Sequence, residues 1–215
     1  MLRLISVTLP VFLLIGCATT NLSSFRAPEF ADASYRRIMI SVPFADFGTR
    51  IEAETIFLKA CSWYSNWRDI TCLSYIQVLP PTQEYTAEEI AKALSDQHID
   101  ALMVIRMTNA YSTQAYVPEF TTTSGRATAS GNTMSYSGQS FSYGGFSVSK
   151  PTVQFEIKLF DAASSKVAWI GGSTTRGNAN AGFDTLLRSL ANSALQRLDQ
   201  DGLIKKKSAF VPSRP

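Results

Sequence analysis

The sequence contains few of the residues that enzymes use for catalysis. Its 215 residues include one histidine, His98, and three cysteines. A Ser-His-Asp or Cys-His arrangement would therefore have to use His98. This residue follows a predicted helix, so we interpret it as a capping or surface residue. Gly-x-Ser-x-Gly, His-Glu-x-x-His and P-loop motifs are also absent from the sequence. The sequence thus predicts no enzyme, no metal site and no cofactor.

Charge is also scarce. Charged residues make up 17% of the chain and the formal net charge is +3. This balance is too weak to indicate a nucleic-acid partner. Apolar residues make up 45%, which is enough for a hydrophobic core, and the length suits one domain.

Long apolar runs are absent except at the N-terminus. Arg3 precedes the apolar run Leu4 to Ile15. The run falls within the range of about 7–15 residues for the middle of a signal peptide, and a membrane-spanning helix needs about 20. With the small residue Gly16 before Cys17, the pattern predicts a signal peptide over 1–16.

The order Leu14-Ile15-Gly16-Cys17 resembles the bacterial lipobox. The resemblance implies cleavage before Cys17, diacylglycerol on its sulfur and acylation of the new amine. Ala18 stands where Asp would favour retention in the inner membrane. The resemblance therefore implies an outer-membrane anchor with the protein facing the periplasm. The alternatives are an ordinary signal peptide and a buried hydrophobic N-terminus.

Two cysteines remain, Cys61 and Cys72. In an oxidising periplasm they can form a disulfide. The alternative is a pair of unrelated buried thiols.

The central pattern alternates strands and helices, and the termini are polar. Residues 17–35 show no hydrophobic periodicity of a helix or strand, which predicts a lipidated tether. Residues 205–215 predict a basic, disordered tail. Between them, 36–204 predicts a single α/β (α+β) domain with a mixed sheet and a βαβαβ start. Thr49–Glu52 and Thr86–Glu89 match capping boxes. The predicted strands are 37–44, 74–79, 101–107, 152–161 and 167–170, and the predicted helices are 50–64, 86–97 and 183–198.

The last helix carries the clearest pattern. Its apolar residues follow the spacing of one helix face, Asp184 favours its N-terminal end, and Gly202 is placed to end it. The predicted buried residues are Phe183, Leu186, Leu187, Leu190, Ala191, Ala194, Leu195 and Leu198.

A long excursion, 117–150, separates two strong strand patterns. Eighteen of the thirty residues in 121–150 are Ser, Thr or Gly, a composition without a core of its own. It predicts either a hairpin extension or an exposed loop, and loops of this length are usually functional or disordered. The candidate partner-binding residues in this region are Arg126, Tyr136, Phe141, Tyr143 and Phe146.

Two further stretches have open interpretations. Gly171–Gly177 precedes the last helix and predicts a structural turn, with an anion-binding loop as the alternative. Trp63, Tyr64 and Trp67 gather at the end of a predicted helix. They indicate core packing or a subunit contact in preference to a ligand site.

Short motifs in the C-terminal half carry a family resemblance. Phe155 to Asp161, Lys166-Val167-Ala168-Trp169 and Asp201 to Ile204 resemble a group of small bacterial lipoproteins. That group shares the fold of the curli-secretion lipoprotein and the N-terminal domain of TolB. Its functions include secretion pores, activators of peptidoglycan synthases and flagellar-ring proteins. The resemblance covers roughly 36–204 and implies a fold rather than one function.

Taken together, these patterns lead to one function hypothesis with two alternatives. The hypothesis is a non-catalytic binding or assembly component of the cell envelope, with an envelope protein or self-association as its partner. One alternative is an oligomeric secretion-pore or ring subunit using 121–150. The other is a regulator of a cell-wall synthase.

Overall fold

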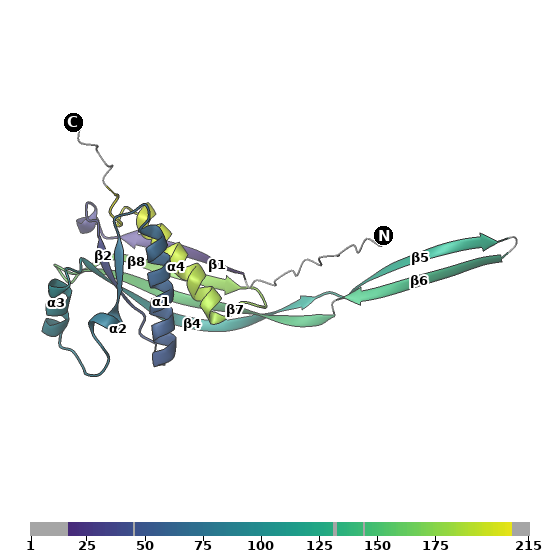
Figure 1. Cartoon of the computed structure of the whole chain (residues 1–215), viewed down its shortest axis with the longest axis horizontal. Coiled ribbons are helices and arrows are strands. Elements are labelled where there is room, and N and C mark those ends of the chain that lie inside the picture. Colours follow the sequence, from purple (N-terminus) through teal and green to yellow (C-terminus); the bar gives the residue numbers. More distant parts are fainter. Residues whose placement is uncertain (1–16, 45, 131–132, 144, 208–215) are drawn as a thin grey trace, which may run out of the picture.

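The computed structural model describes residues 17–44, 46–130, 133–143 and 145–207 (Figure 1). A six-stranded mixed sheet has the strand order β1-β8-β7-β4-β2-β3, and β5 and β6 form a separate two-stranded sheet. The strands are β1 (Ala18–Arg26), β2 (Arg37–Ser41), β3 (Thr71–Ser74), β4 (Ala101–Val117), β5 (Phe120–Ser130), β6 (Thr133–Tyr143), β7 (Phe146–Asp161) and β8 (Val167–Gly177). The helices are η1 (Pro28–Phe30), α1 (Phe47–Tyr64), α2 (Tyr75–Val78), α3 (Ala87–Asp96) and α4 (Phe183–Gln200).

The βαβαβ start forms the parallel half of the sheet. β2 pairs in parallel with β3 on one side and with β4 on the other. Because neighbouring residues of a strand face opposite sides of the sheet, β2 contributes to two cores. Ile38 and Ile40 belong to the main core with α1 and α4, whereas Met39 packs with Leu94 and Ile99 of the α3 region. Helices therefore cover both faces of the parallel half.

The antiparallel half follows the predicted hairpin. β7 and β8 pair antiparallel around a turn in which Ser165 adopts a positive φ of 58°. α4 crosses β8 and β1 and lies beside α1 (Figure 1). Its buried residues confirm the predicted apolar face, with Phe183 half-buried at its start: Leu186, Leu187, Leu190, Ala191, Ala194, Leu195 and Leu198.

The predicted tether over 17–35 is wrong in its first half, because Ala18–Arg26 forms edge strand β1 against β8. Of the inward residues of β1, Ala18 and Leu22 pack against the core, whereas Thr20 and Ser24 are polar but paired. Thr20 Oγ1 lies 2.9 Å from Thr175 Oγ1 and 2.8 Å from Ser189 Oγ, and Ser24 Oγ donates to Asp201 Oδ2 at 2.6 Å. Satisfied polar groups can be buried, so a polar segment can complete this sheet.

The predicted strand over 74–79 is also wrong. β3 ends at Ser74, and Tyr75–Val78 forms the short helix α2. The Ile76 amide donates to the Glu54 carboxylate at 3.2 Å, which satisfies an amide of this helical turn. Glu54 lies twenty-two residues earlier in the chain, so local alternation could not reveal this contact.

The capping predictions have two outcomes. Thr86 and Glu89 form the predicted capping box, with amide-to-side-chain distances of 3.2 and 2.8 Å. The box predicted at Thr49 is wrong, because α1 begins earlier and Asp46 caps it by accepting from the Thr49 amide at 2.6 Å.

The C-terminal segment departs from the predicted tail at its start. Gly202 follows α4 with a φ of 75°, and Leu203 and Ile204 are buried. The Lys205 amide donates to Tyr35 O at 3.2 Å, so 205–207 is docked against the domain. Residues 208–215 of the predicted tail lie outside the described residues, as does the predicted signal peptide 1–16.

Candidate functional site

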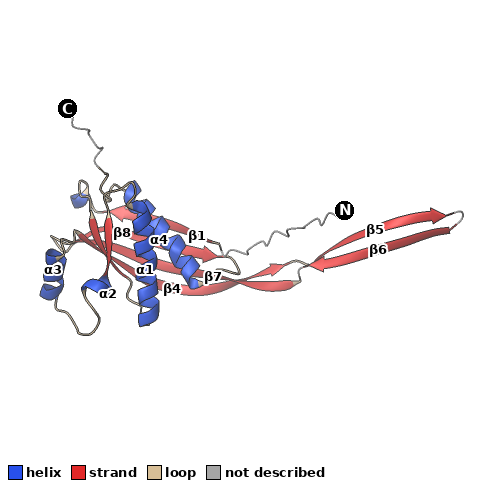
Figure 2. Cartoon of the chain, viewed as in Figure 1, coloured by secondary structure: helices blue, strands red, loops and turns tan. Residues whose placement is uncertain are grey.

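The excursion forms a long two-stranded ribbon, one of the two predicted alternatives. β8 pairs with β7 as far as Thr152, and β4 and β7 continue beyond it to the pair Val117 and Phe146. β5 and β6 then extend the ribbon away from the sheet (Figure 2). We call residues 112–117, 120–130, 133–143 and 146–151 the ribbon. β5 alone has 11 residues, which spans roughly 35 Å at about 3.3 Å per residue.

Three exposed aromatic side chains lie near the junction of the two parts of the ribbon. Tyr116 pairs with Ser147 and Phe146 with Val117, so Tyr116 and Phe146 lie on opposite faces of the strand pair. Tyr116 is 64% exposed, Tyr143 60% and Phe146 43%. The rings of Tyr143 and Phe146 meet edge to face with centroids 5.7 Å apart. We call these three residues the aromatic joint. Exposed aromatic side chains are enriched at interaction surfaces.

The structure separates the predicted partner-binding residues into two groups. Tyr143 and Phe146 are in contact at the joint. In backbone register, Phe141 pairs with Thr122, Tyr136 with Ala127 and Arg126 with Ser137, all in the β5–β6 part. Their side chains lie outside the described part of the structure. Tyr116 was not among the predicted residues. Its position directly before the excursion, in a stretch that also contains Tyr111, could have indicated it.

The ribbon leaves the sheet at the end that carries Cys17. Thr19 pairs with Arg176, Arg176 with Thr152, and Thr152 with Tyr111, so these residues form one row across the sheet. Cys17 is exposed and directly precedes β1. Its carbonyl accepts from the Asn178 amide at 2.9 Å, which holds Cys17 against the sheet without an intervening linker.

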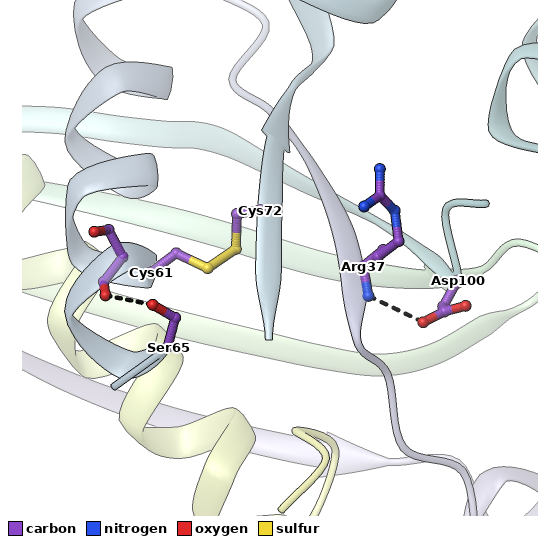
Figure 3. The surroundings of a disulfide bond; sticks show 6 residues. Arg37, Cys61, Ser65, Cys72 and Asp100 are labelled. Atoms are coloured by element: carbon purple, nitrogen blue, oxygen red, sulfur yellow. Dashed lines mark hydrogen bonds between the residues drawn. A yellow bond between two sulfur atoms is a disulfide. The ribbon is translucent and has the colours of Figure 1, made fainter. Parts of the chain in front are cut away.

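Cys61 of α1 and Cys72 of β3 form the predicted disulfide (Figure 3). Their Cα atoms are 6.1 Å apart, and the Cys61 side chain is buried in the core. Since β3 is the edge strand opposite β1, the bond joins this short edge to the helix that covers it.

The predicted aromatic group at the end of α1 divides between core and surface. Tyr64 is buried, whereas Trp63 is 59% and Trp67 38% exposed. The ring centroids of Trp63 and Trp67 are 4.1 Å apart. Trp63 also borders a groove of about 450 Å³ between α1 and α4.

The remaining candidate sites are structural. Gly171–Gly177 is neither a turn nor a loop, because it belongs to β8. His98 follows α3 with a φ of 50°, and its amide donates to Ser95 O at 3.0 Å, as the capping interpretation predicts. Among the described residues, no group of three or more His, Cys, Asp or Glu side chains could hold a metal. Within the same residues, every helix is too short or too polar to cross a membrane.

Comparisons with known proteins give distant structural similarities. No protein-family model and no curated protein matches this chain. A PelC dodecamer from Paraburkholderia phytofirmans is similar at 12% identity and a TM-score of 0.48, over 84% of this chain and 97% of that one. Lipoprotein GNA1162 from Neisseria meningitidis is similar at 14% identity and a TM-score of 0.37, over 76% of this chain and 98% of that one. These values do not assign the chain to a family.

Proposed function

We propose that the protein is a non-catalytic binding or assembly component of the bacterial cell envelope. Lipid on Cys17 would hold it on the outer membrane, facing the periplasm, and the ribbon would contact its partner. The observation that carries this proposal is the position of the ribbon, which leaves the sheet beside Cys17 and exposes the aromatic joint.

The physics of two-stranded ribbons supports a binding role. Two strands without a third strand or a covering helix are marginally stable in water. The outer edges of such a ribbon present backbone N–H and C=O groups on which another strand can pair. Charge repulsion does not oppose this pairing, since the only charged residues in the segment 117–150 are Glu119, Arg126 and Lys150. A partner strand would therefore stabilise the ribbon as well as bind it.

The lipid anchor supports an assembly role. Acyl chains contribute about 0.8 kcal/mol per buried CH₂, so several chains give a lasting membrane attachment. Confinement near a membrane raises the effective concentration of partners held there. Because β1 begins directly after Cys17, the base of the ribbon would lie near the lipid surface.

In-cell photo-crosslinking tests this proposal. A crosslinking amino acid at Tyr116 or Phe146 should form adducts with an envelope protein or with another copy of the chain. The matched control is Lys92, an exposed residue of α3 on the body of the domain. Adducts that include a cell-wall synthase would assign the regulatory alternative. Absence of adducts from both ribbon positions, or equal adducts from Lys92, would contradict the proposal.

A second candidate is an oligomeric pore or ring subunit. β5 and β6 each have 11 residues, and a strand that crosses a bilayer needs about 9–11. Electron microscopy of the detergent-extracted protein tests this candidate, because a pore predicts ring-shaped particles. Uniform monomers in which a protease cleaves 121–150 would exclude it.

A further inference from the structure

A second candidate site lies on the body of the domain, and none of its lining residues belongs to the ribbon. A pocket of about 540 Å³ opens at the carboxyl end of β2, beside Leu102 and Val104 near the start of β4. This volume falls in the range of about 300–1,000 Å³ typical of small-molecule sites. Its lining residues are Ser41, Pro43, Arg50, Tyr75, Leu79, Pro81, Gln83, Glu84, Tyr85, Ile90, Leu102 and Val104.

The topology places this pocket at a position that favours ligand binding. From β2, the chain passes through α1 to β3 on one side, and then through α2 and α3 to β4 on the other side. α1 and α3 belong to cores on opposite faces of the sheet. The direction of winding therefore changes at β2. In open α/β sheets, ligands bind in the crevice outside the carboxyl ends of strands at such a switch point.

A buried carboxylate supports the base of the pocket. Glu54 is 1% exposed and accepts from the Ser74 hydroxyl and, at 3.2 Å, from the Ile76 amide. It also forms an ion pair with Arg50, with Oε1 and Nε 3.7 Å apart. A buried charge persists only when it is paired and hydrogen-bonded, and Glu54 meets both conditions. The arrangement holds Arg50 in place.

The Arg50 guanidinium is positioned by Glu54 and Tyr75, but its Nε makes no hydrogen bond. It lies over the Tyr75 ring with 5.4 Å between Cζ and the ring centroid. Its Nε is buried, has no hydrogen-bond partner and lies 3.7 Å from Glu54 Oε1. Because Nε lies next to Glu54, a ligand in the pocket would accept from the terminal nitrogens Nη1 and Nη2, and hydrogen bonds from a charged donor are stronger than neutral ones. The planar fork of arginine matches a carboxylate with two parallel hydrogen bonds.

We propose that this pocket binds a small organic carboxylate with an apolar body. The carboxylate would accept from Arg50, and the body would pack against Tyr75, Leu79, Ile90, Leu102 and Val104. A phosphate dianion fits less well, because Arg50 is the only cation among the lining residues and Glu54 already lies beside it. Glu84 is exposed at the rim, where water screens its charge. This inference is independent of the ribbon and of the lipid anchor.

Calorimetry on the whole protein tests the proposal with two matched probes. We expect 4-phenylbutyrate to bind, and its neutral amide, 4-phenylbutyramide, to bind at least about tenfold more weakly, because a charge-assisted pair is lost. Equal binding of acid and amide would overturn the proposal, as would no binding of either at millimolar concentration. A tripeptide with a C-terminal Phe carboxylate provides a further arm. Binding of the peptide without binding of the small acid would also overturn it.

Three variants locate the interaction. Arg50→Gln should weaken 4-phenylbutyrate about tenfold or more, whereas Arg50→Lys, which keeps the charge beside Glu54 but loses the fork, should give a smaller loss. Arg188→Gln, on the exposed face of α4, should leave binding unchanged. Because Arg50→Gln leaves Glu54 without its ion pair, circular dichroism must show that it folds. If it does not fold, Arg50→Lys and the acid–amide comparison decide the outcome. Unchanged binding in a folded Arg50 variant would refute the site.

Discussion

The indole N–H of Trp169 donates a hydrogen bond of 2.7 Å to Asp201 Oδ2, which joins β8 to the residue that follows α4. Asp201 Oδ2 also accepts from Ser24 Oγ of β1 at 2.6 Å. One carboxylate therefore connects the closing helix to two neighbouring strands. Trp169 itself is fully buried, so its N–H has no access to water.

Asp201→Ala should lower the free energy of unfolding by about 2 kcal/mol, because it leaves the buried Trp169 N–H without an acceptor. Urea unfolding followed by tryptophan fluorescence measures the change. Asp96→Ala, at an exposed position of α3, is the control and should change stability by less than about 0.5 kcal/mol. Equal stability of the two variants would show that the Asp201 contact contributes nothing.

Two adjacent glycines of β8 should respond oppositely to alanine. A Cβ on Gly171 would lie 2.6 Å from the Trp169 ring, whereas a Cβ on Gly172 would meet nothing within 4 Å. Gly171→Ala should therefore destabilise the protein by about 1–3 kcal/mol through overpacking. Gly172→Ala should stabilise it by up to about 0.5–1 kcal/mol, because glycine weakens a strand. Thermal unfolding of both variants tests the pair, and the reverse order of stability would contradict the close approach of the Trp169 ring to Gly171.

Removing the disulfide should destabilise the domain. Cys61 and Cys72 are separated by 11 residues, and closing such a loop stabilises by roughly 3 kcal/mol in the chain-entropy view. The Cys61→Ala/Cys72→Ala variant should lose about this amount in urea unfolding. A reductant should destabilise the wild-type protein similarly and leave the double variant unchanged. An effect of reductant on the double variant would assign the loss to another cause.

Stability should fall at alkaline pH because of Tyr35. Burial, reinforced by the neighbouring Asp161 carboxylate, raises the pKa of the Tyr35 hydroxyl well above its ordinary value. The unfolded chain loses this proton near pH 10, while the folded protein keeps it. The unfolded state therefore binds fewer protons above about pH 10, and the free energy of unfolding decreases as pH rises. Below that pH the contribution of Tyr35 is fully present.

Urea unfolding between pH 8 and 11 measures this dependence. Tyr35→Phe removes the titrating hydroxyl, so its stability should fall less steeply with pH than that of the wild type. Identical slopes would show that Tyr35 does not cause the alkaline loss.

Local patterns were sufficient for the elements whose partners lie nearby in sequence or whose burial is apolar. The apolar spacing of Leu186 to Leu198 predicted α4, and the Thr86–Glu89 box predicted the start of α3. Clean alternation predicted the β7–β8 hairpin. In each case, the side chains that decide the structure occur within one short window of sequence.

Distant polar partners explain what the sequence could not predict. β1 is stabilised by contacts such as Thr20 with Thr175, which lie 155 residues apart, and polar inward residues such as Thr20 and Ser24 are typical of a linker. In the sequence, Arg50 and Glu54 have the i, i+4 spacing of a helix pair, but nothing indicates a pocket beside them. The pocket forms only when β2, β4 and α2 come together. The excursion's composition allowed a ribbon or a loop. The aromatic joint depends on a strand register that composition does not specify.

The pairing of β1 with β8 also has a consequence for the order in which the protein can form. A chain that crosses a membrane from its N-terminus delivers β1 first, yet its partner β8 lies near the other end of the chain. β1 must therefore wait, unpaired, until most of the chain has emerged. We expect a chain cut before Val167 to stay sensitive to protease along its whole length, because neither β1 nor α1 then has its packing partner in β8 or α4. For a chain exported as we propose, completion of the domain would report that translocation has ended, and only a whole chain would present a folded body behind its ribbon.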